Sequence, residues 1–382
     1  MKIIGLITEY NPFHLGHKYQ ITKIKEIYPN SIIIVITNSS FTQRGEVSIL
    51  NKWNKTKICL ENNIDLVIEL PFAYATQSAD IFAQGALEIL NHLKINILVF
   101  GSESNNIENL FKIANTQLNN ASYNKIVKKH LNNGLNYPTA MSNALKEILG
   151  FTITEPNDLL GISYIKEIIK NNYKITPMTI KRIGEYHEKK VTNNNIISAS
   201  LIRNLYLKNK NITSHIPENV INHLYKNLSN ENYFQYLKYK IISTKDLSIY
   251  QTVEEGIESR IKKEIYNSNT WEELVQNIKT KRYTYNKINR MLIHILVDFT
   301  KKEYKNLKID YIRLLGFSIN GQKYLNKIKK ELEIPIITNY KKNFSNLLDL
   351  ELRAISIYNL ALNESTLTKE FKSPPLKNNQ NQ

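Results

Sequence analysis

Short apolar runs, rich in β-branched residues, recur in the first half of the chain and predict the strands of one sheet. The clearest is Ile32–Thr37 (IIIVIT), because an unbroken apolar run is typical of a strand that is buried on both faces. The predicted strands are 2–8, 32–37, 65–70, 95–101 and 175–182. A sheet made of such strands needs helices to cover it on both sides.

Between these runs, apolar residues return every three or four positions, which predicts helices with one buried face. The predicted helices are 16–28, 50–61, 79–93, 157–170 with Asn157 as its cap, and 198–207, while 106–150 is predicted to be helical as a whole. Strands that alternate with helices are joined by right-handed crossovers and form a parallel sheet. The first half of the chain therefore predicts a Rossmann-like α/β fold.

The pattern changes near residue 215. Beyond it, apolar residues recur at helical intervals among many Lys, Asn and Tyr, and no further strand–helix–strand unit is evident. We therefore expect a Rossmann-like domain over 1–210, a mainly helical region over 215–370, and a disordered tail over 373–382 (SPPLKNNQNQ). A chain of 382 residues is long enough for more than one domain.

Composition narrows the class of protein. The sequence contains no apolar run of about 18 residues, so no membrane span is expected. Met1–Gly5 opens a predicted strand and lacks the features of a signal peptide. Cys59 is the single cysteine, which excludes an internal disulfide framework and a cysteine-built metal site. A cytoplasmic protein is expected.

The positive charge is unevenly distributed. The net charge is +17, of which residues 1–200 carry +5 and residues 201–382 carry +12. An excess that is concentrated in one part of the chain favours a polyanion such as nucleic acid as the partner of that part. The alternative is a Lys- and Asn-rich composition inherited from an AT-rich genome.

The strongest local motif is Glu9–His17 (EYNPFHLGH), which follows the first predicted strand. Ligands of open α/β sheets bind at this edge, Gly16 permits close approach of a phosphate, and the next helix directs its positive end there. His14 and His17 can both donate to a phosphate whose charge builds during in-line attack. A metal site, or two surface histidines without a role, are the alternatives.

A second motif is Ser198–Arg203 (SASLIR), in which hydroxyl groups at a helix start and an arginine one turn later form a candidate anion site. An ordinary N-cap is the alternative. Gly101, Asn157 and Arg182 are predicted at the same edge of the sheet, where each is equally consistent with a plain turn or helix end. The loop Gln43–Glu46 (QRGE) fits either a substrate-facing loop or a solvated turn.

Cations and aromatic residues alternate in 279–290 (KTKRYTYNKINR). Charge suits the RNA backbone, and rings or guanidinium planes suit unpaired bases, so this segment is a candidate RNA surface. A solvated helix face is the alternative. The candidate tRNA-binding residues are Lys281, Arg282, Tyr283, Lys287 and Arg290.

Taken together, these segments resemble the bacterial tRNA(Met) cytidine acetate ligase family of the HIGH-motif nucleotidyltransferase superfamily. The HIGH motif alone indicates only the superfamily, whereas the combination of segments is much narrower. The resemblance covers nearly the whole chain and rests on EYNPFHLGH (9–17), FTQRGE (41–46), DLVIELPFAYATQSADIFAQGA (65–86), VFGSE (99–103), PNDLLGISY (156–164), IKRIGEYH (180–187), SASLIR (198–203) and TKRYTYNKINR (280–290).

The resemblance implies an enzyme that activates acetate with ATP to acetyl-adenylate and transfers the acetyl group to N4 of the wobble cytidine of elongator tRNA(Met), with Mg²⁺ expected as the partner of ATP. It implies that His14 and His17 are catalytic. The implied ATP site consists of Ile7, Thr8, Glu9, Tyr10, Asn11, Pro12, Phe13, His14, Leu15, Gly16, His17, Lys18, Tyr19, Gln20, Gly101, Asn157, Arg182, Ser200 and Arg203. Ala199 departs from the superfamily pattern, which often has a hydroxyl residue there.

Two other functions stay open at this point. A small-molecule adenylyltransferase or synthetase of the same superfamily explains the N-terminal half but leaves the basic half without a role. An RNA-binding protein with a vestigial nucleotide site explains the basic half, but both histidines, Arg182 and Arg203 are retained.

Overall fold

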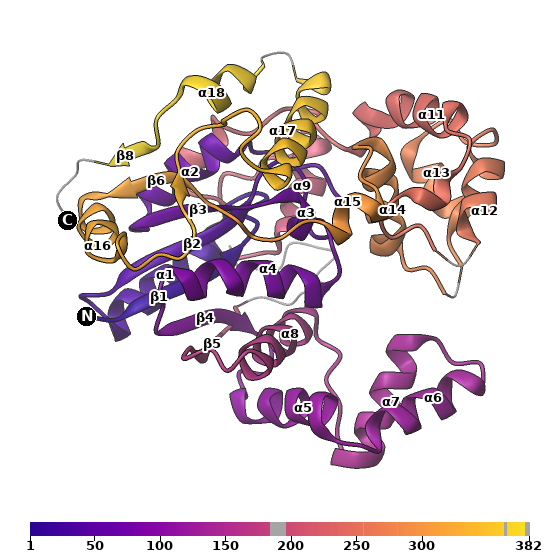
Figure 1. Cartoon of the computed structure of the whole chain (residues 1–382), viewed down its shortest axis with the longest axis horizontal. Helices are drawn as coiled ribbons and strands as arrows, with labels where there is room; N and C mark the ends of the chain where they lie inside the picture. Colours follow the sequence, from indigo (N-terminus) through magenta and orange to yellow (C-terminus); the bar gives the residue numbers. More distant parts are fainter. Residues whose placement is uncertain (184–195, 255, 281, 363–364, 379–382) are drawn as a thin grey trace.

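The computed structural model describes residues 1–183, 196–254, 256–280, 282–362 and 365–378. Its centre is one mixed sheet with helices on both faces (Figure 1). The strand order is β5-β4-β1-β2-β3-β6-β7, and β8 pairs with β6. The strands are β1 Ile3–Thr8, β2 Ile32–Asn38, β3 Leu66–Leu70, β4 Ile97–Ser102, β5 Thr176–Lys181, β6 Ile312–Ser318, β7 Ile336–Ile337 and β8 Leu376–Asn378.

The predicted α/β class is confirmed, since β5, β4, β1, β2 and β3 are parallel throughout. Every residue of β2 is buried, as its unbroken apolar run predicts. Ile33 and Val35 belong to the hydrophobic core on one face, and Ile32, Ile34 and Ile36 to the core on the other. This alternation is the two-residue period of a strand, and it requires the two layers of helices.

The helices of the N-terminal half lie near the predicted positions. The helix over 106–150 is divided in three, with breaks at Asn120–Ser122 and 133–136. In Figure 1, α5–α7 project from the sheet as a separate lobe. The bounds are α1 Leu15–Ile27, α2 Lys52–Glu61, α3 Phe72–Ala75, α4 Ala79–His92, α5 Ile107–Asn119, α6 Tyr123–Asn132, α7 Tyr137–Leu149, α8 Pro156–Lys170 and α9 Ala199–Leu207.

The C-terminal half contributes a second helical lobe, formed mainly by α11–α14, and then returns to the sheet (Figure 1). Its helices are α10 Glu218–Ile221, α11 Phe234–Ser243, α12 Ile257–Glu264, α13 Trp271–Ile278, α14 Tyr285–Leu296, α15 Lys301–Lys305, α16 Ile319–Ile328, α17 Asn346–Tyr358 and α18 Leu367–Lys372. Short 3₁₀ turns cover Asn230–Tyr233, Leu247–Ile249 and Asn359–Ala361. The predicted helical character of this half is confirmed.

Three details of the prediction are wrong. The region 215–370 contains β6, which extends the central sheet by pairing antiparallel with β3. A strand that joins an existing sheet edge from far along the chain has no local strand–helix–strand signal. The tail is not disordered throughout, because β8 pairs parallel with β6 and Asn378 Nδ2 donates to Leu60 O at 2.9 Å; residues 379–382 lie outside the described range.

The third correction concerns α8. Its N-cap is Glu155, without a side-chain cap bond, and Pro156 takes the first helical position, where its fixed φ is favourable. Asn157 therefore lies inside the first turn instead of capping it. Its side chain is free to face away from the helix, toward the end of β4.

Candidate nucleotide-binding and transfer site

Two histidines fix the start of α1, directly beyond β1. His14 is the N-cap residue: its Nδ1 accepts from Gly16 N at 3.0 Å, and His14 N donates to His17 Nδ1 at 3.2 Å. The two rings stack with their centroids 3.7 Å apart. These reciprocal bonds form a capping box made of imidazoles in place of the usual hydroxyl and carboxylate.

Burial and the capping box together determine the charge of the two imidazole rings and which ring nitrogen carries the proton. Burial, and then the charge of Arg182, lower the pKa of His14 from 6.5 to about 3. Burial, His14 and Arg182 lower the pKa of His17 well below its usual value. Both rings are therefore neutral at physiological pH. Because each Nδ1 accepts a backbone N–H, each ring carries its proton on Nε2, where it can donate to a ligand.

The neighbouring strands bring Arg182 and Gly101 to the same edge. Arg182 follows β5, and its Nε lies 3.7 Å from Glu103 Oε1. A Cβ at Gly101 would lie 3.2 Å from Arg182 Cγ, so the glycine leaves room for this side chain. Glu103 also accepts from Asn157 Nδ2 at 2.5 Å and from Asp158 N at 3.1 Å. Glu103 thus holds the start of α8 and Arg182 in one arrangement.

The start of α9 forms the opposite wall. Ser198 caps the helix by accepting from Leu201 N at 3.3 Å, and its Oγ lies 3.1 Å from Ser200 Oγ. One turn later, Arg203 Nη1 donates to Asn11 O at 2.6 Å, and Nη2 pairs with Glu46. Ser198 is therefore the N-cap of α9, and Ser198, Ser200 and Arg203 all line the cavity between the two helix starts.

The loop Gln43–Glu46 is held by Glu9 and by two residues of the C-terminal half, Asn230 and Arg290. Gln43 N donates to Glu9 Oε1 at 2.5 Å, and Arg290 Nη1 donates to Gln43 O at 3.1 Å. Asn230 Nδ2 donates to Gly45 O at 2.9 Å. This loop is anchored, and it faces the cavity through Gln43, Arg44 and Glu46.

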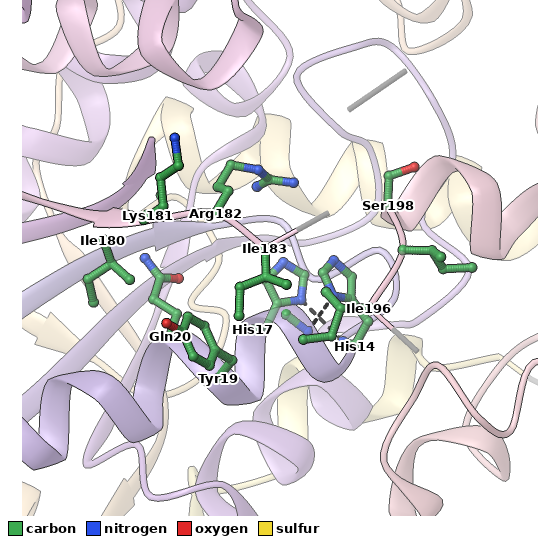
Figure 2. A pocket seen from close by; sticks show the side chains of 13 residues that line it. His14, His17, Tyr19, Gln20, Ile180, Lys181, Arg182, Ile183, Ile196 and Ser198 are labelled. Atoms are coloured by element: carbon green, nitrogen blue, oxygen red, sulfur yellow. Dashed lines mark hydrogen bonds between the residues drawn. The ribbon is translucent and has the colours of Figure 1, made fainter. Parts of the chain in front are cut away.

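These elements enclose a cavity of about 570 Å³, within the usual range for ligand sites. Figure 2 shows the two histidine rings side by side at the start of α1, with Arg182 and Ser198 approaching from β5 and α9. The cavity of about 570 Å³ is lined by Ile7, Thr8, Glu9, Tyr10, Asn11, His14, His17, Gln20, Gln43, Arg44, Glu46, Ala79, Phe82, Pro156, Asn157, Leu159, Leu160, Tyr164, Arg182, Ser198, Ala199, Ser200, Arg203 and Asn286.

A smaller pocket adjoins this cavity. His14, His17, Gln20, Arg182 and Ser198 line both. The smaller pocket is completed by Gly16, Tyr19, Gly101, Ile180, Lys181, Ile183, Ile196 and Ile197. The combined site therefore has two ends with the histidines between them.

Most residues of the predicted ATP site line one of these two spaces. Four do not: Pro12 and Phe13 are buried below the turn, Leu15 lies at the helix start, and Lys18 is exposed. Asn11 lines the cavity, but its side chain is occupied, since Nδ2 donates to Val47 O and Oδ1 accepts from Ile49 N. Asn11 therefore shapes the turn.

Sequence reasoning missed the apolar wall of the cavity. Phe82 comes from α4, and Leu159, Leu160 and Tyr164 come from α8. These residues are spaced along their helices as core residues are, and most of the apolar residues next to them in α4 and α8 are buried in the hydrophobic core. These residues lie in two segments that carry the family resemblance, 65–86 and 156–164, whereas apolar periodicity alone does not distinguish them from core residues. Asn286, at the start of α14, is the contribution of the basic segment to the same cavity.

Of the predicted tRNA-binding residues, Arg282 and Lys287 lie at the surface or are partly buried, whereas Tyr283 and Arg290 are hydrogen-bonded within the protein. Arg282 is exposed, and Lys287 Nζ lies 4.8 Å from the centre of the Tyr283 ring. Tyr283 is buried, with its hydroxyl donating to Glu254 O, so its ring is not presented for base stacking. Arg290 is engaged with Gln43. Lys281 lies outside the described residues.

Neither a metal site nor a membrane-spanning helix is found among the described residues. They contain no group of three or more His, Cys, Asp or Glu side chains that could hold a metal ion. No described helix is both long enough and apolar enough to cross a membrane. Cys59 is buried and makes no disulfide, and burial raises the pKa of its thiol.

The fold and the cleft define a nucleotidyltransferase of the HIGH type. The sequence model of the family described as HIGH Nucleotidyl Transferase matches residues 1–373. The relatives narrow this class. Proteins named tRNA(Met) cytidine acetate ligase are 40% identical in Caldicellulosiruptor saccharolyticus, over 98% of both chains, and 36% identical in a Geobacillus species, over 98% of this chain and 100% of that one. The chain belongs to the tRNA(Met) cytidine acetate ligase family.

Solved structures agree with this result. The crystal structure of apo Thermotoga maritima TmcAL matches with a TM-score of 0.91 at 27% identity, with both chains fully covered. A second form of that protein, bound with alpha-thio ATP, matches with a TM-score of 0.89 over both whole chains. The predicted family and fold class are confirmed.

Proposed function

We propose that this protein binds ATP and acetate in the cleft, forms acetyl-adenylate with release of pyrophosphate, and transfers the acetyl group to N4 of the wobble cytidine of elongator tRNA(Met). The observation that carries the proposal is the neutral histidine pair at the start of α1, whose Nε2–H groups are available as donors. The names of the full-length relatives, and the ATP analogue bound to the Thermotoga maritima protein, support it.

Adenylate formation needs charge stabilisation more than a protein nucleophile. The acetate oxygen attacks the α-phosphorus, and negative charge builds on the phosphate oxygens as pyrophosphate leaves. The imidazole donors, the Arg182 guanidinium and the N-terminal ends of α1 and α9 all offer positive potential around this space. Holding acetate and ATP together supplies the remaining advantage by proximity.

Mg²⁺ enters this proposal as a partner of the triphosphate. It is usually held by one or two carboxylates together with phosphate oxygens. No step described here depends on it.

The acceptor is proposed to approach past α14. Asn286 lines the cavity, and exposed Arg282 and neighbouring Lys287 lie beside it in sequence. Cations at this rim would contact the RNA backbone while the target base enters the cleft. In this proposal, 1–210 is mainly the nucleotide-binding part, 215–370 the RNA-facing part, and the enzyme acts in the cytoplasm.

The test is incubation of the protein with ATP, acetate and bulk tRNA, followed by mass spectrometry of the tRNA nucleosides. The expected product is N4-acetylcytidine in elongator tRNA(Met). In the absence of tRNA, the protein should catalyse acetate-dependent ATP–pyrophosphate exchange. A small-molecule synthetase would show exchange with a different acid, and an RNA-binding protein with a vestigial site would show none. Absence of acetylcytidine would defeat the proposal.

A further inference from the structure

Two carboxylates line the larger cavity among the described residues, Glu9 and Glu46. Glu46 is paired with Arg203. Glu9, in the turn after β1, accepts from Gln43 N through Oε1, and its other oxygen, Oε2, makes no hydrogen bond to a described residue. One oxygen therefore anchors the side chain, and the other is available to a ligand.

Glu9 stands at one end of the site. The pocket around Gly16, Tyr19 and Gly101 does not include it, whereas the larger cavity places it with Phe82, Tyr164 and Asn286. The histidines line both spaces. An α-phosphate bound at the histidines would therefore have the narrow glycine-lined pocket on one side and Glu9 with its apolar neighbours on the other.

The end that contains Glu9 suits an aromatic base with an exocyclic amine. Apolar and aromatic walls accept the faces of a base, and a carboxylate is the acceptor that matches the amino group of cytosine. Glu9 is partly buried, so a hydrogen bond to it would be only weakly screened by water.

We propose that Glu9 is the general base of acetyl transfer and contacts the acceptor amine. The amine nitrogen attacks the carbonyl carbon of acetyl-adenylate and the C–N bond forms. The bond from that carbon to the phosphate oxygen then breaks, and AMP leaves with the electron pair. The proton lost by the nitrogen passes to Glu9 Oε2. This inference rests on the proposed function and assigns Glu9 to its second step.

The electrostatic surroundings agree with this assignment. Burial raises the pKa of Glu9, while the bond from Gln43 N and the charges of Arg44 and Lys55 lower it and Glu46 raises it. Tyr164 also faces this carboxylate, whose charge raises the tyrosine pKa together with burial. A carboxylate with a raised pKa is a better proton acceptor than an ordinary one.

The experiment separates the two half-reactions in the full-length protein. Glu9→Gln keeps an oxygen to accept from Gln43 N but cannot take a proton. Any loss of acetate-dependent ATP–pyrophosphate exchange should be much smaller than the loss of transfer, because Glu9 is assigned to the second step. Single-turnover transfer from acetyl-adenylate to tRNA should fall by roughly 10²- to 10⁴-fold, the usual contribution of a general base. The rise of the transfer rate with pH should disappear.

Glu9→Asp provides the conservative comparison, and thermal unfolding checks the fold of both variants. Transfer by Glu9→Asp should lie between the wild type and Glu9→Gln and should keep the rise with pH. Three results would overturn the inference: Glu9→Gln transfers at the wild-type rate, exchange falls as far as transfer, or Glu9→Asp behaves like Glu9→Gln. Failure of the proposed function is distinct, because the wild type would then form no acetylcytidine.

Discussion

At the scale of the residue, His14 has two roles in one side chain. Its Nδ1 caps α1 by accepting from Gly16 N, and the same bond places the ring proton on Nε2, facing the cavity. The structural and the chemical role therefore use different nitrogen atoms. Substitutions can remove one role while leaving the other.

His14→Asn should separate these roles. Asn is among the best N-cap residues, so the unfolding free energy should change little, while loss of the Nε2 donor should lower acetate-dependent exchange by roughly 10²- to 10³-fold. His14→Ala should lose the same activity and about 1 kcal/mol of stability in addition. Urea unfolding and exchange assays measure both quantities. Exchange at the wild-type rate in His14→Asn would remove His14 from the catalytic step.

The lowered pKa of His14 also predicts a dependence of stability on pH. The folded state disfavours protonation down to about pH 3, whereas the unfolded histidine binds a proton near pH 6.5. The unfolded state therefore holds more protons between these values, and stability falls as pH decreases through this window. The wild type should lose up to about 1.4 kcal/mol per pH unit more than His14→Asn. The unfolding free energies of both proteins are measured by urea unfolding from pH 7 to pH 4. An equal fall with pH in the wild type and in His14→Asn would contradict this prediction.

At the scale of the element, the loop 43–46 depends on α14. Gly45 has φ of 73°, and a Cβ there would lie 2.4 Å from Arg290 N in the backbone of that helix. The loop therefore needs glycine for two reasons, the left-handed backbone and the close approach. Gly150, which ends α7 with φ of 79°, has the left-handed backbone but no close approach, since nothing lies within 4 Å of its Cβ position.

This pair gives a matched prediction. Gly150→Ala should cost about 1–2 kcal/mol for a left-handed alanine. Gly45→Ala should cost more, because the helix or the loop must also move, and it should lower the rate of acetyl transfer by displacing Gln43 from Glu9. Urea unfolding of both variants provides the measurement. An equal loss of unfolding free energy in the two variants would show that the close approach of α14 does not constrain the residue at position 45.

At the scale of the whole molecule, a buried charge cluster ties the C-terminal segments to the N-terminal sheet. Lys52 Nζ lies 2.6 Å from Glu69 Oε1 and 2.7 Å from Glu370 Oε2. Arg313 Nη2 lies 3.3 Å from the same oxygen of Glu370. Glu351 accepts from the backbone nearby, and burial together with Glu69 raises its pKa to about 8. These residues come from α2, β3, α18, β6 and α17.

Lys52→Met should therefore destabilise the whole fold, by about 3–5 kcal/mol, because it leaves the buried carboxylate of Glu69 without its cation and Glu370 with Arg313 alone. Lys57→Met is the control on the same helix. Lys57 is exposed, 4.0 Å from Glu61, and its loss should change the unfolding free energy by no more than about 0.5 kcal/mol. A small effect for Lys52→Met in urea unfolding would mean that the cluster is not needed for cohesion.

Features that are controlled by local sequence pattern could be predicted before the structure was known. The buried run 32–37 predicted β2, the repeat of apolar residues predicted the helices, and the His-Leu-Gly-His turn after the first strand predicted the location of the candidate site. The resemblance, carried by several short segments, predicted the family. Each of these signals lies within a few residues of the feature it specifies.

Features that depend on residues far apart in the chain became visible only in the folded structure. The addition of β6 and β8 to the sheet follows from pairing with β3 and with each other. Phe82 and Tyr164 line the cavity only because α4 and α8 meet there, and Arg290 proved to be a support for Gln43. Such contacts depend on packing between distant segments, for which a local pattern of polar and apolar residues carries no information.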